Sequence, residues 1–414
     1  MLHLLNSMTR LMEPFEARNG RMVKMFSCGP SIYRRPHVGN YRTFIWEDAL
    51  QRYLEYLGYD VRRVLNFTDV EDKAIEEARQ DGKAVGELTG AVADRFTAEA
   101  RMLGIKLPEK IPRSSTSVQQ AAALISRLLA SGHAYRYEGN IFFDPLKFKS
   151  FGKLFRLDMS RWPREKRRFK KDTYPGQRWN LGDFILWHGA GEGDEIYWDT
   201  EIGKGRPAWN IQDPAMISET LGYDLDIFCG GIDNMWRHHD YNIAVMESLS
   251  GEELARFWLH GEHVLAGGKK MSKSLSNIVY PEDLVEQGRG GRHIRFYLLS
   301  TQYRKRLNLT MDAFRKSCAK LDAFVSMVGD ILEQRGGTRF AVDEGVEKLI
   351  AELTTRFEAG MNDDLDTHKA LEGVAGTVAG LHGLWKAGRI GPDQTRAIEA
   401  GLRRVDSVLR VIFE

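Results

Sequence analysis

The first part of the chain alternates between short apolar runs and segments whose apolar side chains recur at helical spacing. The run at residues 23–27 precedes a Cys-Gly-Pro turn and predicts a buried strand. Residues 43–57 follow the helical period until Gly58, which ends the predicted helix. Residues 61–67 predict the next strand, and Thr68 or Asp69 is predicted to cap a second helix that runs to about residue 79. This alternation of strand and helix predicts a parallel sheet covered by helices.

The remaining sequence divides into a mixed segment and a purely helical one. The further predicted helices lie near residues 85–103, 118–131, 211–221 and 236–249, and the further predicted strands at 134–137, 140–144, 184–187, 225–228 and 257–265. Residues 148–205 are rich in glycine, charge and tryptophan, and we expect irregular structure there apart from the strand at 184–187. After residue 310, four helical segments follow, near 311–334, 344–360, 367–387 and 393–411. An α-helical bundle is therefore predicted after an α/β core.

Composition narrows the class of protein. The chain has 414 residues, enough for two or three domains, and its 43% hydrophobic and 28% charged residues are ordinary for a globular protein. No apolar run is long enough to span a bilayer, and the N-terminus lacks the features of a cleavable leader. We therefore expect a cytoplasmic protein without a membrane partner. Three cysteines, Cys28, Cys229 and Cys318, argue against a disulfide framework in so long a chain.

Charge is informative only locally. The net charge of +2 gives no general case for nucleic-acid binding. One basic run stands out, opposed only by Glu165, and its members are Arg161, Arg164, Lys166, Arg167, Arg168, Lys170 and Lys171. A phosphate-rich partner is one interpretation of this run. A solvated surface loop is the simpler interpretation, and we favour it.

A short motif, Pro36-His37-Val38-Gly39-Asn40, lies between the first predicted strand and the first predicted helix. The N-terminus of a helix offers free N–H groups and the positive end of a dipole, which suits phosphate. Gly39 lets the backbone approach a ligand closely, and His37 can donate a hydrogen bond to a phosphate oxygen. Alone, the motif is weak, and we favour an ordinary turn from strand to helix as its explanation.

The segment Lys269-Lys270-Met271-Ser272-Lys273-Ser274 is a sharper signal. Lys270 and Lys273 are three residues apart on a loop that begins with Gly267 and Gly268, so both lysines can wrap around a triphosphate. Their charge would stabilise pyrophosphate as it leaves. A basic surface loop is the competing interpretation.

Together these motifs, about 230 residues apart, resemble the two hallmark motifs of class I aminoacyl-tRNA synthetases. More specifically, the chain resembles cysteinyl-tRNA synthetases and their shorter relative, the cysteine ligase of mycothiol synthesis. The matching stretches are FSCGPSIYRRPHVGNYRTF, NFTDVEDKAIEEA, GHAYRYEGNIFFD, GDFILWH, GKGRPAWNIQDPAM, GGIDNMWRHHDYNIA, GGKKMSKSLSN and MNDDLDTHKAL. They cover roughly residues 20 to 390.

The resemblance implies a Rossmann-like catalytic domain with a parallel sheet at residues 1–310. A connective insertion at about 112–205 would interrupt this domain, and the KMSKS loop region would occupy about 266–310. A C-terminal α-helical bundle at 311–414 would follow. The small terminal domain with which cysteinyl-tRNA synthetases read the anticodon has no counterpart before Glu414.

The resemblance also implies roles for individual residues. His37 and Asn40 contact the ATP phosphates, and Lys270 and Lys273 lie on the mobile KMSKS loop. The implied ATP-binding positions are Gly39, Gly230, Gly231, Asp233, Met271, Ser272 and Ser274, and Thr68 and Trp209 are implied in the wall of the amino-acid pocket. The substrate carboxylate then attacks the α-phosphate of ATP bound with Mg²⁺, which gives an acyl-adenylate and pyrophosphate. Positioning and charge stabilisation carry the catalysis.

The sequence departs from the family at the zinc ion that binds the thiolate of cysteine. The ligand positions map to Cys28, Asp213, His238 and Asn242, where the family has Cys, Cys, His and Glu. His238 and Asn242 are four residues apart and share a helix face. Because a neutral amide is a poor zinc ligand, we expect zinc binding to be weak or lost. The substrate would then differ from cysteine, and Asp213 could bind a cationic or hydroxyl-bearing group. A degenerate site that binds cysteine poorly is the alternative.

Neighbouring positions change as well. Asn210 and Gln212 replace His and Glu of the family, and Cys229 replaces a glycine, most simply as a small buried residue.

Three functions remain open at the level of sequence. The first, which we favour, is a monomeric ligase that adenylates an amino-acid-like substrate and transfers it to a small amine or carrier, because nothing after the bundle remains to read bases. The second is a cysteine–tRNA ligase without anticodon recognition, which could hold a tRNA acceptor end by its phosphates. The third is a catalytically silent binding or regulatory protein. The intact HVGN and KMSKS motifs argue against the third.

Overall fold

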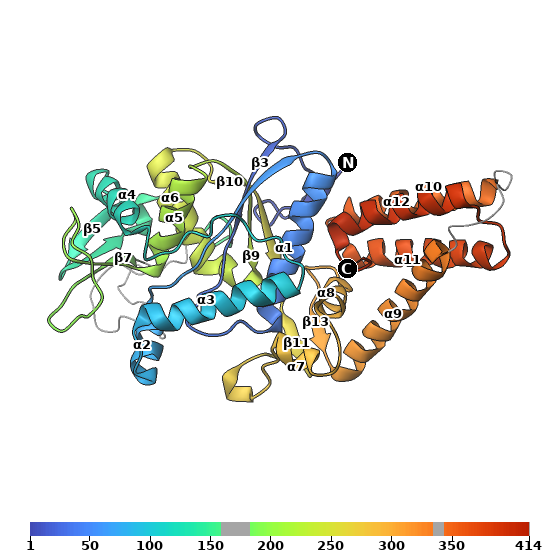
Figure 1. Ribbon diagram of the computed structural model, residues 1–414. Helices are drawn as coiled ribbons and strands as arrows, with labels where there is room; N and C mark the ends of the chain where they lie inside the picture. Colours follow the sequence, from blue (N-terminus) through green and yellow to red (C-terminus); the bar gives the residue numbers. More distant parts are fainter. Residues whose placement is uncertain (159–182, 334–342, 414) are drawn as a thin grey trace.

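A computed structural model describes residues 1–158, 183–333 and 343–413. Its central sheet has the order β10-β9-β3-β4, with β3 at Met22–Ser27, β4 at Asp60–Leu65, β9 at Leu225–Gly231 and β10 at Ala255–Gly261. Each neighbouring pair in this sheet is parallel. The predicted α/β fold with a parallel sheet is therefore confirmed (Figure 1).

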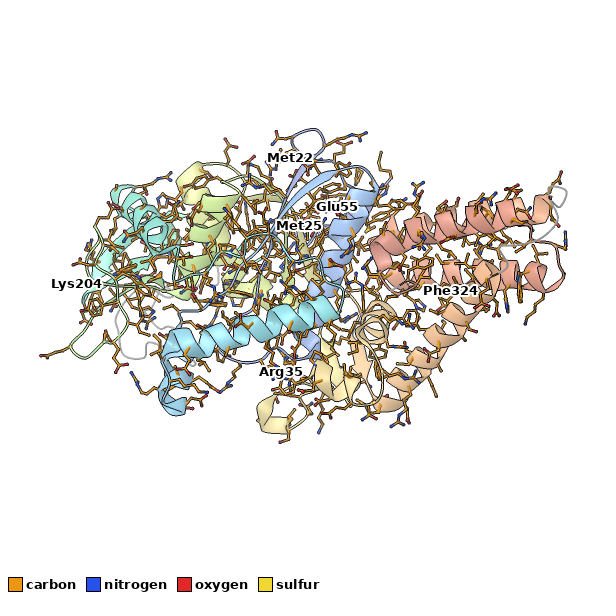
Figure 2. The ribbon with its side chains drawn as sticks, in the orientation of Figure 1. Met22, Met25, Arg35, Glu55, Lys204 and Phe324 are labelled. Carbon is orange, nitrogen blue, oxygen red and sulfur yellow. The ribbon has the colours of Figure 1, made fainter. Side chains whose placement is uncertain are left out.

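Helices cover both faces of the sheet because strand side chains alternate between them. Met25 and Ile227 face the core that contains α1 (Val38–Tyr56), whereas Phe26 and Phe228 face α5 (Trp209–Thr220) and α6 (Asp240–Ser250). Figure 2 shows Met25 in the interior, and Met22, at the start of the same strand, is 45% exposed.

A second sheet, antiparallel, lies within the segment between the two halves of the parallel sheet. Its order is β5-β6-β7-β8, with β5 at Ala134–Tyr137, β6 at Asn140–Phe143, β7 at Phe184–Gly189 and β8 at Gly205–Pro207. Strands β5 and β6 form a hairpin that turns where Glu138 and Gly139 both have positive φ, at 46° and 77°. Helix α4 (Val118–Ala130) packs on this sheet. The basic run at 161–171 lies outside the described residues.

The other elements complete the description. The chain begins with the antiparallel pair β1 (His3–Leu5) and β2 (Met12–Pro14), and α2 (Asp72–Asp81) and α3 (Val85–Met102) follow β4. After β10 come β11 (Val264–Ala266), β12 (Lys269–Lys270), α7 (Pro281–Val285), α8 (Gly291–Leu299) and β13 (Leu307–Leu309). Four C-terminal helices end the chain: α9 (Met311–Glu333), α10 (Glu344–Met361), α11 (Thr367–Lys386) and α12 (Pro392–Leu409). No helix in the described ranges is long and apolar enough to cross a membrane.

Three predicted boundaries were wrong, each for a local reason. Helix α1 begins at Val38, five residues before the expected start, because Asn40 Oδ1 accepts the His37 N–H at 3.0 Å. Helix α2 begins at Asp72 rather than directly after a cap at Thr68 or Asp69, because the Asp69 carboxylate binds Ser114 and Ser115 instead of capping a helix.

The third error concerns the predicted helix at 236–249. It begins with a distorted turn in which Arg237 has φ 72°, so the regular helix α6 starts only at Asp240.

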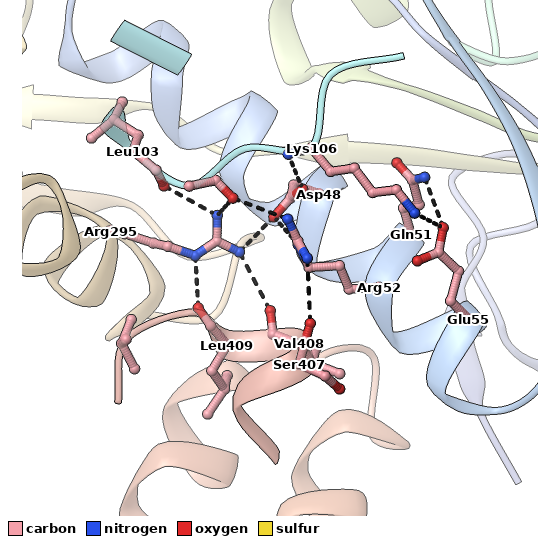
Figure 3. Close-up of polar contacts among 12 residues, drawn as sticks. Asp48, Gln51, Arg52, Glu55, Leu103, Lys106, Arg295, Ser407, Val408 and Leu409 are labelled. Atoms are coloured by element: carbon pink, nitrogen blue, oxygen red, sulfur yellow. Dashed lines mark hydrogen bonds and ion pairs between the residues drawn. The ribbon is translucent and has the colours of Figure 1, made fainter. Parts of the chain in front are cut away.

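A buried ion pair joins the C-terminal helices to the α/β core (Figure 3). The guanidinium of Arg295 on α8 donates to Asp48 Oδ2 on α1 at 2.6 Å and to the carbonyl of Leu409, at the end of α12, at 2.7 Å. Both charged side chains are 0% exposed. Burial alone would raise the pKa of Asp48, but Arg295 and Arg52 hold it below its ordinary value. One guanidinium thus satisfies carbonyls and a carboxylate from separate elements.

We predict that Asp48→Ala destabilises the protein strongly. It leaves the Arg295 guanidinium buried without its counter-charge, for which the expected loss is about 3–5 kcal/mol of unfolding free energy. Denaturant unfolding measures this loss. Asp312→Asn, which removes an exposed pair with Arg315, is the control and should leave the midpoint unchanged. Equal midpoints for the two variants would contradict the role of the buried pair.

Candidate active site

A cavity of about 500 Å³ lies at the carboxyl edge of the parallel sheet. Strand β3 lies between β4 and β9, so the segments that leave β3 and β9 diverge, and a crevice opens between them. The residues from the sequence prediction that line this cavity are Cys28, His37, Asn40, Thr68, Trp209, Gly231, Asp233, Met271 and Ser272. Residues from both motifs and from the expected amino-acid pocket therefore meet at one place.

Other predicted residues do not line the cavity. Asp213, His238 and Asn242 are buried behind its wall. Gly230 lies at the end of β9, and Ser274 lies in the short helical turn Lys273–Leu275 with its Oγ 3.2 Å from Ser272 Oγ. The side chain of Lys273 lies outside the described part of the structure.

The HVGN motif forms the first turn of α1. His37 and Asn40 face the cavity, and the Cβ of an alanine at Gly39 would lie 2.9 Å from His37 Nδ1 and Cε1. Glycine is therefore required for the His37 ring to fold back over the turn. Burial, and then the nearby charge of Lys270, lower the pKa of His37. His37 is thus a neutral imidazole near neutral pH, and it can donate one hydrogen bond to a ligand oxygen.

The KMSKS segment approaches the same cavity from β12. Gly267 and Gly268, both with positive φ, form the turn between β11 and β12, and Lys270 ends β12. The Nζ of Lys270 lies 3.4 Å from Asp233 Oδ2. Asn277 closes the loop, because its Oδ1 accepts the Ser272 N–H at 2.9 Å and its Nδ2 donates to the Lys270 carbonyl at 3.1 Å.

Behind the cavity wall, the four positions expected as zinc ligands come together. Cys28 Sγ lies 3.3 Å from His238 Nε2, which lies 2.9 Å from Asp213 Oδ2. Asn242 Nδ2 is 3.5 Å from the same Asp213 oxygen. Burial, and then the charge of Asp213, raise the pKa of the Cys28 thiol well above its ordinary value. Without a cation, Cys28 is therefore a neutral thiol.

This cluster is not arranged as a nucleophile triad. In a triad the carboxylate binds the ring nitrogen opposite the one that faces the nucleophile. Here Cys28 Sγ and Asp213 Oδ2 both meet Nε2 of His238, and Nδ1 has no partner among the described residues. Donor atoms that converge on one point are the arrangement of metal ligands.

The residues fit a zinc ion. Zinc is bound by Cys, His and Asp through bonds of about 2.0–2.3 Å, so its ligand atoms lie roughly 3–4 Å apart. The ligand atoms of Cys28, His238 and His239 lie within 4.8 Å of one another, and the buried Nε2 of His239 has no partner in the described structure. Weak or lost zinc binding stays a prediction, and the converging donors weigh against it.

Sequence reasoning missed His239. Its Nδ1 lies 2.8 Å from His260 Nε2, and its ring packs so closely on Gly230 that a Cβ there would be 2.7 Å from His239 Cε1. Burial, followed by His260 and His238, lowers the pKa of His239 well below its ordinary value, so the imidazole is neutral and can serve as a ligand. A second histidine directly after His238 was the available signal.

Comparison with known proteins decides the family. Residues 14–319 match the model of the class I tRNA synthetase (C) catalytic domain. The chain belongs to the class I aminoacyl-tRNA synthetase family. It is 35% identical to the cysteine–tRNA ligase of Solibacter usitatus over 99% of this chain and 87% of that protein. It is 33% identical to the cysteine–tRNA ligase of Chlamydia muridarum over 99% of this chain and 88% of that protein.

The solved structures agree on the fold. A methionyl-tRNA synthetase of Mycobacterium tuberculosis in complex with methionyl-adenylate superposes with a TM-score of 0.68, covering 95% of this chain and 90% of that chain at 16% sequence identity. This synthetase chain is accordingly an ATP-dependent ligase by family, with the Rossmann-like architecture, an insertion and C-terminal helices.

We predict that Gly39→Ala impairs ATP use without unfolding this synthetase. The added Cβ displaces the His37 ring, and we expect a loss of about 10-fold or more in ATP-dependent kcat/KM. Pyrophosphate exchange measures this effect. Gly90→Ala on α3, where a Cβ meets nothing within 4 Å, is the matched control and should keep full activity. An active Gly39→Ala protein would show that the His37 ring position does not matter.

Proposed function

We propose that this synthetase joins an amino acid to AMP and transfers the aminoacyl group to the acceptor end of a tRNA. One observation carries the proposal: His37 and Asn40 of the first motif, Met271 and Ser272 of the second, and Cys28 line a single cavity. Its volume, about 500 Å³, is within the range of small-molecule sites.

The first step is a displacement at phosphorus. A carboxylate oxygen of the amino acid forms a bond to the α-phosphorus of ATP, the bond to the β-phosphate oxygen breaks, and pyrophosphate leaves with that electron pair. Neutral His37 and the Asn40 amide are suited to donate hydrogen bonds to phosphate oxygens. Lys270 and Lys273 supply positive charge to the leaving pyrophosphate. Magnesium ion accompanies ATP as in the family.

For the amino acid, we propose cysteine. The sequence favoured another substrate and a non-tRNA acceptor, but the named relatives, both cysteine–tRNA ligases, support the other alternative better. The converging donors of Cys28, Asp213 and His238 also suit a zinc site. When bound there, zinc supplies a borderline-soft Lewis acid that favours a substrate thiolate over a hydroxyl. Thr68 and Trp209 form the adjoining wall of the pocket.

A second candidate is an altered amino-acid specificity with a small amine or carrier as acceptor. It is favoured by the hydrogen bonds that already occupy Asp213. Asn66 Nδ2 donates to its Oδ1 at 2.9 Å, and His238 lies 2.9 Å from its Oδ2. With Asp213 held by these hydrogen bonds, Cys28 could contact a polar side chain of the amino acid without any metal. The silent-protein alternative receives no support from a cavity lined by both motifs.

We predict cysteine-dependent pyrophosphate exchange that exceeds serine-dependent exchange by about 100-fold or more, because a dedicated contact to the thiol discriminates strongly. Purified protein should contain one zinc ion per chain. Charging of total tRNA with labelled cysteine tests the acceptor, with small amines offered in parallel. Metal-free protein that activates a different polar amino acid would establish the second candidate instead.

We also predict that Lys273→Ala reduces adenylate formation by about 100-fold or more, the scale for removing a charge that stabilises a transition state. Single-turnover formation of the adenylate measures this step. Lys269→Ala, which removes an exposed neighbouring lysine, is the matched control and should stay within a few-fold of the parent protein. Equal effects of the two variants would argue against a specific role for Lys273.

A further inference from the structure

Ion pairs outside the catalytic residues join the HVGN turn to the segment that follows the KMSKS loop. Arg35 lies two residues before His37, and its side chain is 19% exposed. Its guanidinium donates to Glu99 Oε1 on α3, at 2.9 and 2.6 Å, and to Glu282 Oε2 on α7, at 2.8 Å. The guanidinium also lies 4.6 Å from the centre of the Tyr280 ring. Figure 2 shows Arg35 below α3 and beside α7.

The two acidic partners of Arg35 are held from the other side as well. Arg95 donates to Glu99 Oε1 at 3.2 Å and to Glu282 Oε2 at 2.6 Å. The buried Tyr41 hydroxyl donates to Glu99 Oε2 at 2.7 Å. Two guanidiniums and two carboxylates thus alternate in a closed ring, with Glu99 as its buried member. Hydrogen bonding from Arg35 is the largest cause that lowers the pKa of Glu282, which keeps this carboxylate ionised.

Backbone contacts tie the same segments together. The N–H of Val38, at the start of α1, donates to the carbonyl of Val279 at 2.9 Å. The N–H of Tyr280 donates to Asp283 Oδ2 at 2.7 Å and so caps α7. Val279, Tyr280 and Glu282 are therefore fixed against the HVGN turn through one main-chain bond and the side chain of Arg35.

This segment is the point to which the KMSKS loop returns. The loop leaves the fold at β12, where Lys270 ends the strand, and its exposed part is closed by Asn277. The two ends of a short loop limit where its middle can reach. The return end, at Val279 and beyond, therefore sets how closely the loop lysines approach His37 across the cavity.

We propose that Arg35 is a positioning residue for adenylate formation. Through Glu282 and Tyr280 it fixes the return end of the KMSKS loop against the HVGN turn, so that the lysines of that loop meet the triphosphate bound by His37 and Asn40. The inference rests on the proposed function in one respect, namely that the ligand between the two motifs is ATP. Arg35 lines the cavity beside His37, and the role proposed for it is exerted through Glu282 and Tyr280.

A positioning role has a specific kinetic signature. The amino-acid end of the cavity, at Cys28, Thr68 and Trp209, is formed by other elements, so loosening the loop should not change the KM for the amino acid. It should lower kcat for pyrophosphate exchange and raise the KM for ATP, because alignment of the triphosphate is lost.

Glu282→Gln is the main test, because it keeps the shape of a half-exposed side chain and removes only its charge. We expect kcat for exchange to fall by about 10-fold, with the amino-acid KM within about twofold of the parent value. Arg35→Lys keeps the charge but cannot bridge Glu99 and Glu282 with a planar guanidinium. It should therefore also lower kcat and leave the amino-acid KM unchanged.

Glu77→Gln is the matched control. Glu77 on α2 accepts two hydrogen bonds from Arg34, at 2.8 and 2.5 Å. Arg34 lines the cavity next to Arg35, but its ion pair reaches α2 instead of α7. Glu77→Gln should therefore leave exchange unchanged. Thermal unfolding of each variant, compared with the parent protein, checks that the substitutions leave the fold intact.

A second readout separates this inference from the proposed function. Hydrogen exchange of residues 269–280 is compared with and without a non-hydrolysable ATP analogue, and it requires no amino acid. We expect the analogue to protect the loop in the parent protein and in Glu77→Gln, and to protect it less in Glu282→Gln. Equal protection and equal kcat in the two variants would overturn the role of Arg35. A parent protein whose loop is protected by the analogue but which activates no amino acid would contradict only the proposed function.

Discussion

The position of β3 in the middle of the parallel sheet determines where chemistry can occur in this molecule. The chain enters the sheet at β3, adds β4 on one side and returns to add β9 on the other. Because all these strands run in one direction, whatever follows β3 and β9 is delivered to the same edge. Cys28 and the HVGN turn follow β3, and Gly230 and Gly231 end β9. The Cys28 N–H bonds to the Cys229 carbonyl at 3.2 Å and keeps the two strand ends together.

Two backbone segments approach closely at this edge of the sheet, which explains why residue 29, outside both motifs, is a glycine. A Cβ on Gly29 would lie 1.7 Å from the Asn66 carbonyl oxygen, so no larger residue fits. The Asn66 side chain then links both sides of the crevice, because its Oδ1 accepts the Gly29 N–H at 2.8 Å and its Nδ2 donates to Asp213 at 2.9 Å. Asn66 follows β4, so the third strand end also supports the cavity wall at Gly29.

Periodicity and motifs predicted the architecture well because both depend on local sequence. The strand at β3, the helices α9–α12 and the parallel sheet follow from apolar spacing, and the convergence of HVGN and KMSKS follows from the resemblance. The predictions that were wrong or missing concern side chains whose partners lie far away in the sequence. Asp69 looked like a helix cap from the sequence but binds Ser114, 45 residues away. The ring that contains Arg35, Glu99 and Glu282 joins residues up to 247 positions apart, and no local sequence pattern predicts it.

The cluster of Cys28, Asp213, His238 and Asn242 shows how a change of ligands redistributes charge. Two thiolates and one carboxylate, as in the family pattern, carry three negative charges, whereas one thiolate and the Asp213 carboxylate carry two. A zinc ion in the present set would therefore be held less tightly, but its charge would be less neutralised and would favour the deprotonated form of a substrate thiol more strongly. Asn66 offsets part of the first effect, because it fixes the Asp213 carboxylate towards His238 before any ion arrives. Asp213, His238 and Asn242 are also buried. A buried site has a low dielectric constant, which strengthens the attraction between a cation and the Asp213 carboxylate.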